Sequence, residues 1–354
     1  MDLSALIEAR GEPLVLAAGG AVIGLLFGLA AQRCRFCARA AVIECGDGAP
    51  GGRLAVWLLA FAAALLGTQL VVLTGHLKPE ATRFLSGQGS LSGAAIGGLL
   101  FGAGMILTRG CASRLLILSG SGNLRALISG LVFAVAVQAS IGGWLVPLRQ
   151  FLASLWLIDG GTGRGILSAA RLGPGWGVGV ALAVLLGAMW LFQRKLSGRL
   201  WLALGAIGTG LMVPAGWAYT QAVATRSFEP VPLQSLSFSG PSAEWLMRVL
   251  ASQQAPSFGF DAGLLPGTFI GALAGAVLWR EFRFEGFKTE NRLGHYITGA
   301  FLMGFGAVLA GGCTVGAGMT GGALFAVTAW LTLACIWAGA TLTLHLHRRM
   351  GWAC

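Results

Sequence analysis

The stretch "LAGGCTVGAGMTGGALF" at residues 309–325 places a single cysteine, Cys313, among glycines and other small residues inside a long apolar segment. A second stretch, "LTRGCASRLLILSGS" at residues 107–121, places Cys111 directly after Gly110 in the same way. In both stretches a glycine-rich apolar helix stops at Gly-Cys and an apolar segment resumes after it. The two breaks predict a pair of related sites, each carrying one thiol.

The two breaks lie in copies of one another at a constant offset along the chain. Residues 98–111, "GLLFGAGMILTRGC", align with residues 300–313, "AFLMGFGAVLAGGC". Four glycines and the cysteine coincide at this offset, counting the residue before each stretch: Gly97 and Gly299, Gly102 and Gly304, Gly104 and Gly306, Gly110 and Gly312, and Cys111 and Cys313. Glycines alone could serve only to let helices pack closely. Close packing does not explain why both copies end in Gly-Cys.

The composition is that of a membrane protein. The chain has 354 residues, of which 56% are hydrophobic and only 10% are charged, whereas soluble domains carry about 25% charged residues. About 20 apolar residues span a bilayer, and nine segments meet that length. They lie near residues 14–31, 54–74, 91–108, 124–147, 176–193, 199–219, 262–279, 294–310 and 321–344. We therefore expect an all-α polytopic protein forming one membrane domain over residues 1–354, without a cleavable signal peptide.

The basic residues predict the orientation of the chain in the membrane. Of the 24 Lys and Arg residues, eight fall on the side that holds the N-terminus and sixteen on the other side. Lys and Arg concentrate in cytoplasmic loops, so we expect a periplasmic N-terminus and a cytoplasmic C-terminus in a bacterial inner membrane. Residues 221–261 form the one long polar connection and are expected to be an extramembrane loop. No basic patch in a soluble module favours nucleic-acid binding.

The repeat predicts an inverted architecture. The two Gly-Cys breaks end the third and eighth spans, which are an odd number of crossings apart, so the two copies point in opposite directions. Inverted repeats with broken helices near the membrane midplane are typical of transporters. The expected halves are residues 14–147 and 199–344, each with short broken or re-entrant helices.

The residues after each cysteine predict an anion site. Ser113 and Thr314 lie near the caps of the short helices that follow Cys111 and Cys313. A helix N-terminus presents free N–H groups and can hold an anion. A thiol is a weak donor and a soft, polarizable contact, which suits an anion with an exposed sulfur atom. Arg109, beside the first break, could attract a dianion, although anchoring at the membrane surface would also explain it.

Three motifs resemble the YeeE/YedE sulfur-transport family, whose characterised members take up thiosulfate. They are "FGLAAQRCRFC" (27–37), "FGAGMILTRGCAS" (101–113) and "GFGAVLAGGCTVGAG" (304–318). The resemblance implies an hourglass-shaped helical protein in which thiosulfate is handed along three functional cysteines, which fall on Cys37, Cys111 and Cys313. It also implies a small cytoplasmic sulfur-carrier protein with a persulfide-forming cysteine as partner.

The chain departs from the family pattern at three positions, which leaves the exact solute open. Cys34 and Arg114 stand where small residues are usual, and Ala317 stands where a polar residue is common. Another sulfur or selenium species could therefore be the cargo. Cys34 also completes a Cys-x-x-Cys pair with Cys37, which leaves open a membrane enzyme that moves sulfur by persulfide or disulfide chemistry. A subunit of a larger membrane complex is a further alternative.

From these observations we expect a transporter, not an enzyme, that takes up thiosulfate or a related sulfur anion and needs no metal or cofactor. The expected partners are the anion and the lipid bilayer, together with the sulfur carrier that the family resemblance implies. The candidate pathway residues are Cys37, Cys111, Cys313, Gly110, Gly312, Thr314, Ser113 and Arg109.

Overall fold

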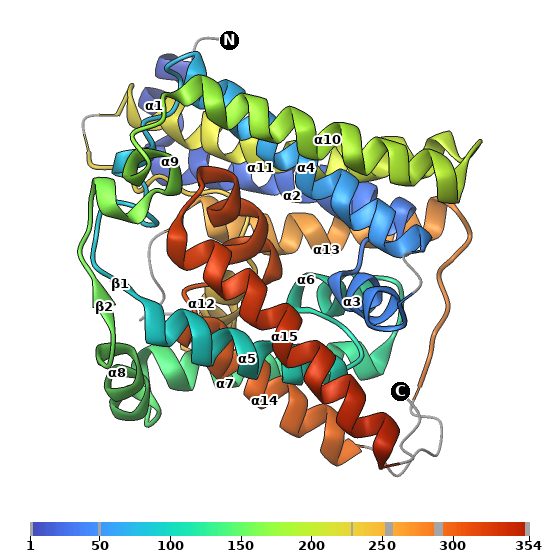
Figure 1. Ribbon diagram of the computed structural model, residues 1–354. Helices are drawn as coiled ribbons and strands as arrows, with labels where there is room; N and C mark the ends of the chain where they lie inside the picture. The colour runs from blue at the N-terminus through green and yellow to red at the C-terminus, as the bar shows by residue number, and fades with distance from the viewer. Residues whose placement is uncertain (1–2, 49–50, 228, 252–257, 287–292, 351–354) are drawn as a thin grey trace.

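The computed structural model describes residues 3–48, 51–227, 229–251, 258–286 and 293–350 (Figure 1). Within these residues, nine helices are long and apolar enough to cross a membrane. The predicted all-α polytopic membrane fold is therefore confirmed. Lys288, Arg292 and Cys354, and parts of the expected loop at 221–261, lie outside the described residues.

Each predicted span coincides with one long helix. The long helices are α2 (Glu12–Cys34), α4 (Gly52–Leu73), α5 (Leu91–Leu107), α7 (Leu124–Gly142), α10 (Pro174–Leu196), α11 (Leu200–Ala224), α13 (Phe260–Leu278), α14 (Leu293–Leu309) and α15 (Val327–Arg349). The last helix begins later than expected because a 3₁₀ turn, η5 (Gly322–Leu324), is followed by Phe325 in a left-handed conformation with φ 54°.

Shorter elements connect the long helices. The short helical elements are α1 (Leu3–Arg10), α3 (Ala38–Gly46), η1 (Pro79–Ala81), α6 (Ala112–Gly120), α8 (Val146–Ser154), η2 (Thr162–Arg164), α9 (Ile166–Ala169), α12 (Ser239–Leu250) and η4 (Thr314–Gly321), the last with π-helical hydrogen bonding. Strands β1 (Gly89–Ser90) and β2 (Leu157–Ile158) pair antiparallel. In Figure 1, β1, β2, α8 and α9 gather at the left end of the molecule, whereas α3 and the C-terminal end of α15 lie at the right end.

The long helices form two clusters. One contains α2, α4, α10, α11 and α13, and the other contains α5, α7, α14 and α15 (Figure 1). Glycines let the helices of a cluster approach closely. A Cβ on Gly24 of α2 would lie 2.4 Å from the Leu264 carbonyl oxygen of α13, and one on Gly263 would lie 1.8 Å from that of Ala17. The close contact of small residues stabilises helix pairs in membranes.

Five short segments lie between the two clusters and contact both. Helix α3 contacts α4 and α15, α6 and α12 each contact α7 and α13, and η4 and η5 each contact α4 and α15. Every residue of η4 is buried. A broken helix is tolerated at membrane depth only where protein or a water-filled cavity surrounds it, and the two clusters provide that surrounding.

The contacts of the first half of the chain have counterparts in the second half. The order α2–α3–α4–α5–α6–α7 matches the order α11–α12–α13–α14–η4–α15. Exchanging matched elements turns the α2–α13 contact into α11–α4, the α5–α15 contact into α14–α7, and the α3–α15 contact into α12–α7, all of which are present. On this correspondence we propose that residues 14–147 and 199–344 are the two halves of the repeat.

The polar connection between α11 and α13 contains a buried part. Leu236 and Phe238 are buried. The Ser235 hydroxyl donates to the Val213 carbonyl in the middle of α11 (2.7 Å), and the Thr320 hydroxyl of η4 donates to the Leu236 carbonyl (2.7 Å). This segment therefore enters the protein before α12 begins, which brings α12 into contact with the central elements.

Candidate anion pathway

The same backbone turn precedes each of the three candidate cysteines. Two residues before Cys37, Cys111 and Cys313, the chain adopts a left-handed conformation, at Arg35 (φ 51°), Arg109 (φ 58°) and Gly311 (φ 77°). A left-handed residue ends a helix, so α2, α5 and α14 stop here. The cysteine that follows is then the N-cap of a short segment: Cys37 of α3, Cys111 of α6 and Cys313 of η4. The turn thus places each thiol at a helix N-terminus.

The three thiols interact electrostatically in two pairs that share one cysteine. Cys37 interacts electrostatically with Cys111, and Cys111 with Cys313. Cys111 and Cys313 are fully buried, whereas Cys37 is partly exposed. All the described cysteines are free thiols. Cys111 is thus the cysteine that interacts with both Cys313 and Cys37.

Each buried thiol has a polar neighbour on its own segment. The Cys313 sulfur accepts a hydrogen bond from the Gly316 backbone N–H (3.4 Å), and the Cys111 sulfur lies 3.4 Å from the Ser113 hydroxyl oxygen. Thr314 is 1% exposed. Its hydroxyl oxygen is buried without a hydrogen-bond partner among the described residues. It is therefore a donor that a bound anion could use.

Gly110 and Gly312, which precede the two buried cysteines, differ in how much room there is for a side chain. A Cβ on Gly312 would lie 2.6 Å from the Ala317 backbone nitrogen of η4. The nearest atoms to a Cβ on Gly110 belong to side chains, namely those of Leu115 at 3.3 Å and Arg114 at 3.7 Å. Because a backbone atom yields less easily than a side-chain tip, Gly312 is required for the close approach of η4, and Gly110 is less constrained.

Sequence reasoning missed the start of α12 as part of this region. Phe238 is the N-cap of α12, and its backbone lies near enough to the Cys313 sulfur to interact with it electrostatically. The Ser237 hydroxyl oxygen would lie 2.7 Å from a Cβ on Gly316, and it too is buried without a partner among the described residues. The segment carries no cysteine and so gave no signal. Its place between α11 and α13, which matches that of α3 between α2 and α4, could have revealed it.

The arginines near the thiols are Arg114 and Arg39, which both interact electrostatically with Cys37. Arg114 also interacts with Cys34. Arg109, the arginine that the sequence favoured, is half-buried at the left-handed turn before Cys111. Arg109 lies two residues before Cys111 and takes part in the turn that ends α5. Arg114 lies three residues after Cys111 and is the one that interacts with the thiols.

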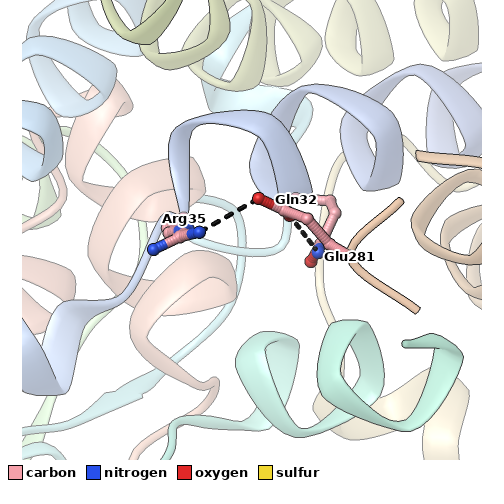
Figure 2. Close-up of polar contacts among 3 residues, drawn as sticks. All are labelled: Gln32, Arg35 and Glu281. Carbon is pink, nitrogen blue, oxygen red and sulfur yellow. Dashed lines mark hydrogen bonds and ion pairs between the residues drawn. The ribbon is translucent and has the colours of Figure 1, made fainter. Parts of the chain in front are cut away.

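Two cavities open near the ends of α2 and α13, and arginines line both. The larger, of about 640 Å³, includes Cys34 in its wall, and the smaller, of about 430 Å³, includes Arg114. Arg35 and Glu281 line both cavities and form an ion pair of 3.0 Å, to which Gln32 adds a hydrogen bond of 3.0 Å to the second Glu281 oxygen (Figure 2).

The members of the Cys-x-x-Cys pair have different neighbours. The Cys34 sulfur lies 3.7 Å from the Thr209 hydroxyl oxygen of α11 and 3.8 Å from the Ala31 carbonyl oxygen. The Cys37 sulfur is instead within electrostatic range of Cys111. Within the described part of the chain, no group of three or more His, Cys, Asp or Glu side chains could hold a metal ion.

Comparison with known proteins identifies the family. A family model described as sulphur transport matches residues 33–342. The chain belongs to the sulphur transport family. The sulphur transport match begins just before Cys37 and includes all the short segments between the two helix clusters. The resemblance seen in the three cysteine motifs is thereby confirmed.

Two curated relatives within this sulphur transport family are named thiosulfate transporter TsuA. The protein from Spirochaeta thermophila is 28% identical over 330 residues, which cover 88% of this chain and 93% of the relative. The protein from Escherichia coli is 24% identical over 341 residues, which cover 89% of this chain and 90% of the relative. The similarity therefore extends over nearly the whole length of all three proteins.

Proposed function

We propose that this member of the sulphur transport family carries thiosulfate, or a closely related sulfur anion, across a bacterial inner membrane. One observation carries the proposal: three free thiols, each at the N-terminus of a short segment between the two helix clusters, lie in electrostatic range in the order Cys313, Cys111, Cys37. The names of the two relatives support thiosulfate as the solute.

Each thiol station would hold the anion weakly. The S–H group donates a weak hydrogen bond to the terminal sulfur of the anion, and the N–H groups and hydroxyls at the helix N-terminus face its oxygens. Ser113, Thr314 and Ser237 supply such hydroxyls. Conduction requires binding that is favourable enough to enter and weak enough to leave, and neutral thiols meet both needs because a thiolate would repel an anion.

The end that holds α3 and the arginine-lined cavities would face the cytoplasm, since Lys and Arg concentrate on that side of membrane proteins. The N-terminus then lies in the periplasm and the anion moves from Cys313 toward Cys37. A small sulfur-carrier protein with a persulfide-forming cysteine would take up the anion at the cytoplasmic end, as the family resemblance implies.

Growth on thiosulfate tests the proposal. A bacterium that lacks its own sulfate and thiosulfate uptake is given this chain and thiosulfate as sole sulfur source. We expect growth with the intact chain and loss of growth with Cys111→Ala or Cys313→Ala at equal membrane abundance. Normal growth of both variants would refute the thiol pathway. The absence of growth with a well-expressed intact chain, with or without the carrier, would refute thiosulfate as the solute.

A further inference from the structure

The smaller cavity at the arginine-rich end is strongly cationic. It has a volume of about 430 Å³ and lies where α6, α13 and the start of α4 meet. Five arginines line it, namely Arg35, Arg53, Arg114, Arg280 and Arg283. Among the described residues of its lining, two are carboxylates, Glu281 and Glu285. A cavity whose wall carries mostly one sign of charge concentrates counter-ions from solution.

Both carboxylates of this cavity already have partners in its wall. Glu281 accepts hydrogen bonds from Arg35 and Gln32, as Figure 2 shows, and Glu285 accepts one from Asn123. The five arginines outnumber these two carboxylates, so the described lining of the cavity keeps an excess of positive charge.

Arg114 is the member of this wall that reaches the thiols. It interacts electrostatically with Cys37 and Cys34. Its Nη1 atom is buried and has no hydrogen-bond partner among the described residues. A buried guanidinium nitrogen without a partner is costly. Anchoring at a membrane surface explains arginines that reach water, but it does not explain a buried guanidinium nitrogen that has no partner among the described residues.

We propose that Arg114 and this cavity bind a divalent tetrahedral oxyanion through its oxygens. This oxyanion site is the station that follows Cys37 on the path toward the cytoplasm. The inference rests on the proposed function, since it takes the ligand to be the oxygen-bearing end of the transported sulfur anion. The thiols contact sulfur, whereas a planar guanidinium matches the geometry of two oxygens of an oxyanion. The anion therefore exchanges sulfur contacts for oxygen contacts as it leaves the buried row.

Sulfate is the probe that separates this station from the thiol row, because it carries the same oxygens but lacks the terminal sulfur. Its affinity is measured by titration calorimetry on the purified full chain in detergent at constant ionic strength. We expect saturable binding to the intact chain. Arg114→Ala should weaken it about ten- to hundredfold, the value of one or more hydrogen bonds to a charged group. Arg114→Gln, which keeps a polar hydrogen-bonding side chain without the charge, should weaken it as well.

The matched control removes an arginine that lies away from the cavity. Arg194 is exposed near the end of α10 and stacks over Trp190. Arg194→Ala removes the same charge and should leave the sulfate affinity unchanged. Equal affinities of Arg114→Ala and Arg194→Ala would overturn the proposal, as would the absence of sulfate binding by the intact chain. Should Arg114→Ala fail to fold, Arg114→Gln decides in its place.

The result is independent of thiosulfate transport. Cys37→Ala should lose thiosulfate uptake and still bind sulfate. A chain that transports no thiosulfate but binds sulfate through Arg114 would refute the proposed solute and keep the oxyanion station. A chain that transports thiosulfate but binds no sulfate would refute the oxyanion station and keep the proposed solute.

Discussion

Gly312→Ala tests whether η4 must approach the end of α14 to place Cys313. The added Cβ would lie 2.6 Å from the Ala317 backbone nitrogen and 3.1 Å from the Ala317 Cβ, whereas ordinary contact begins at 3.4 Å. The η4 backbone would therefore have to move by about 0.8 Å. All of η4 is buried, so the movement has no free space to use. Overpacking of this kind costs about 1–3 kcal/mol of stability.

The movement should also disturb the thiol station. Cys313 is held by the Gly316 N–H, and Gly316 packs against Ser237. A shift of η4 displaces all of these groups together. We expect a lower unfolding temperature and an initial rate of thiosulfate uptake reduced severalfold or more.

The measurement pairs thermal unfolding of the purified protein with uptake into vesicles. Gly130→Ala on α7 is the control, because nothing lies within 4 Å of a Cβ at that position. Gly110→Ala should give a smaller loss than Gly312→Ala, since the nearest atoms to its Cβ belong to side chains, at 3.3 Å or more. Stability and uptake of Gly312→Ala equal to those of Gly130→Ala would show that the close approach of η4 is not required.

Three further predictions concern other parts of the pathway. Ser237→Ala should raise the KM for thiosulfate about tenfold by removing one hydrogen bond to an anion, and an unchanged KM would place this hydroxyl outside the pathway. Cys34→Ala should retain most uptake, because its sulfur faces Thr209; a loss as complete as that of Cys37→Ala would instead indicate a redox pair. Glu281→Gln should cost less than about 1 kcal/mol of stability, because its ion-pair partner is 55% exposed, and should strengthen sulfate binding; weaker sulfate binding would contradict the charge argument.

The hydropathy of the chain predicts the long helices well, because a run of about 20 apolar residues has the length of a membrane-spanning helix. The breaks at Cys111 and Cys313 were also predictable, since the repeat aligns their glycines. The left-handed turn two residues before each cysteine was not, because glycine holds that position in only one of the three cases. Arginine at the other two gives no sign of such a turn.

The elements that the sequence did not reveal are those fixed by tertiary contacts. The segment that leads to Ser237 reads as a polar loop rich in proline, yet its Ser235 hydroxyl donates to α11 and its Leu236 carbonyl accepts from η4. The role of Arg114 depends on α6 lying against the end of α13, which no local pattern encodes. By contrast, the sequence pointed to Arg109 because it adjoins Gly110 along the chain.

The central claim is that the anion crosses intact over Cys313, Cys111 and Cys37. The most direct measurement adds thiosulfate labelled in both sulfur atoms to the outside of proteoliposomes that contain only this chain, and identifies the species that accumulates inside by mass spectrometry. The account predicts doubly labelled thiosulfate in the lumen, and no accumulation with Cys111→Ala. Sulfite carrying one label, together with a persulfide on a cysteine of the chain, would contradict the account and indicate a sulfur-transfer enzyme instead.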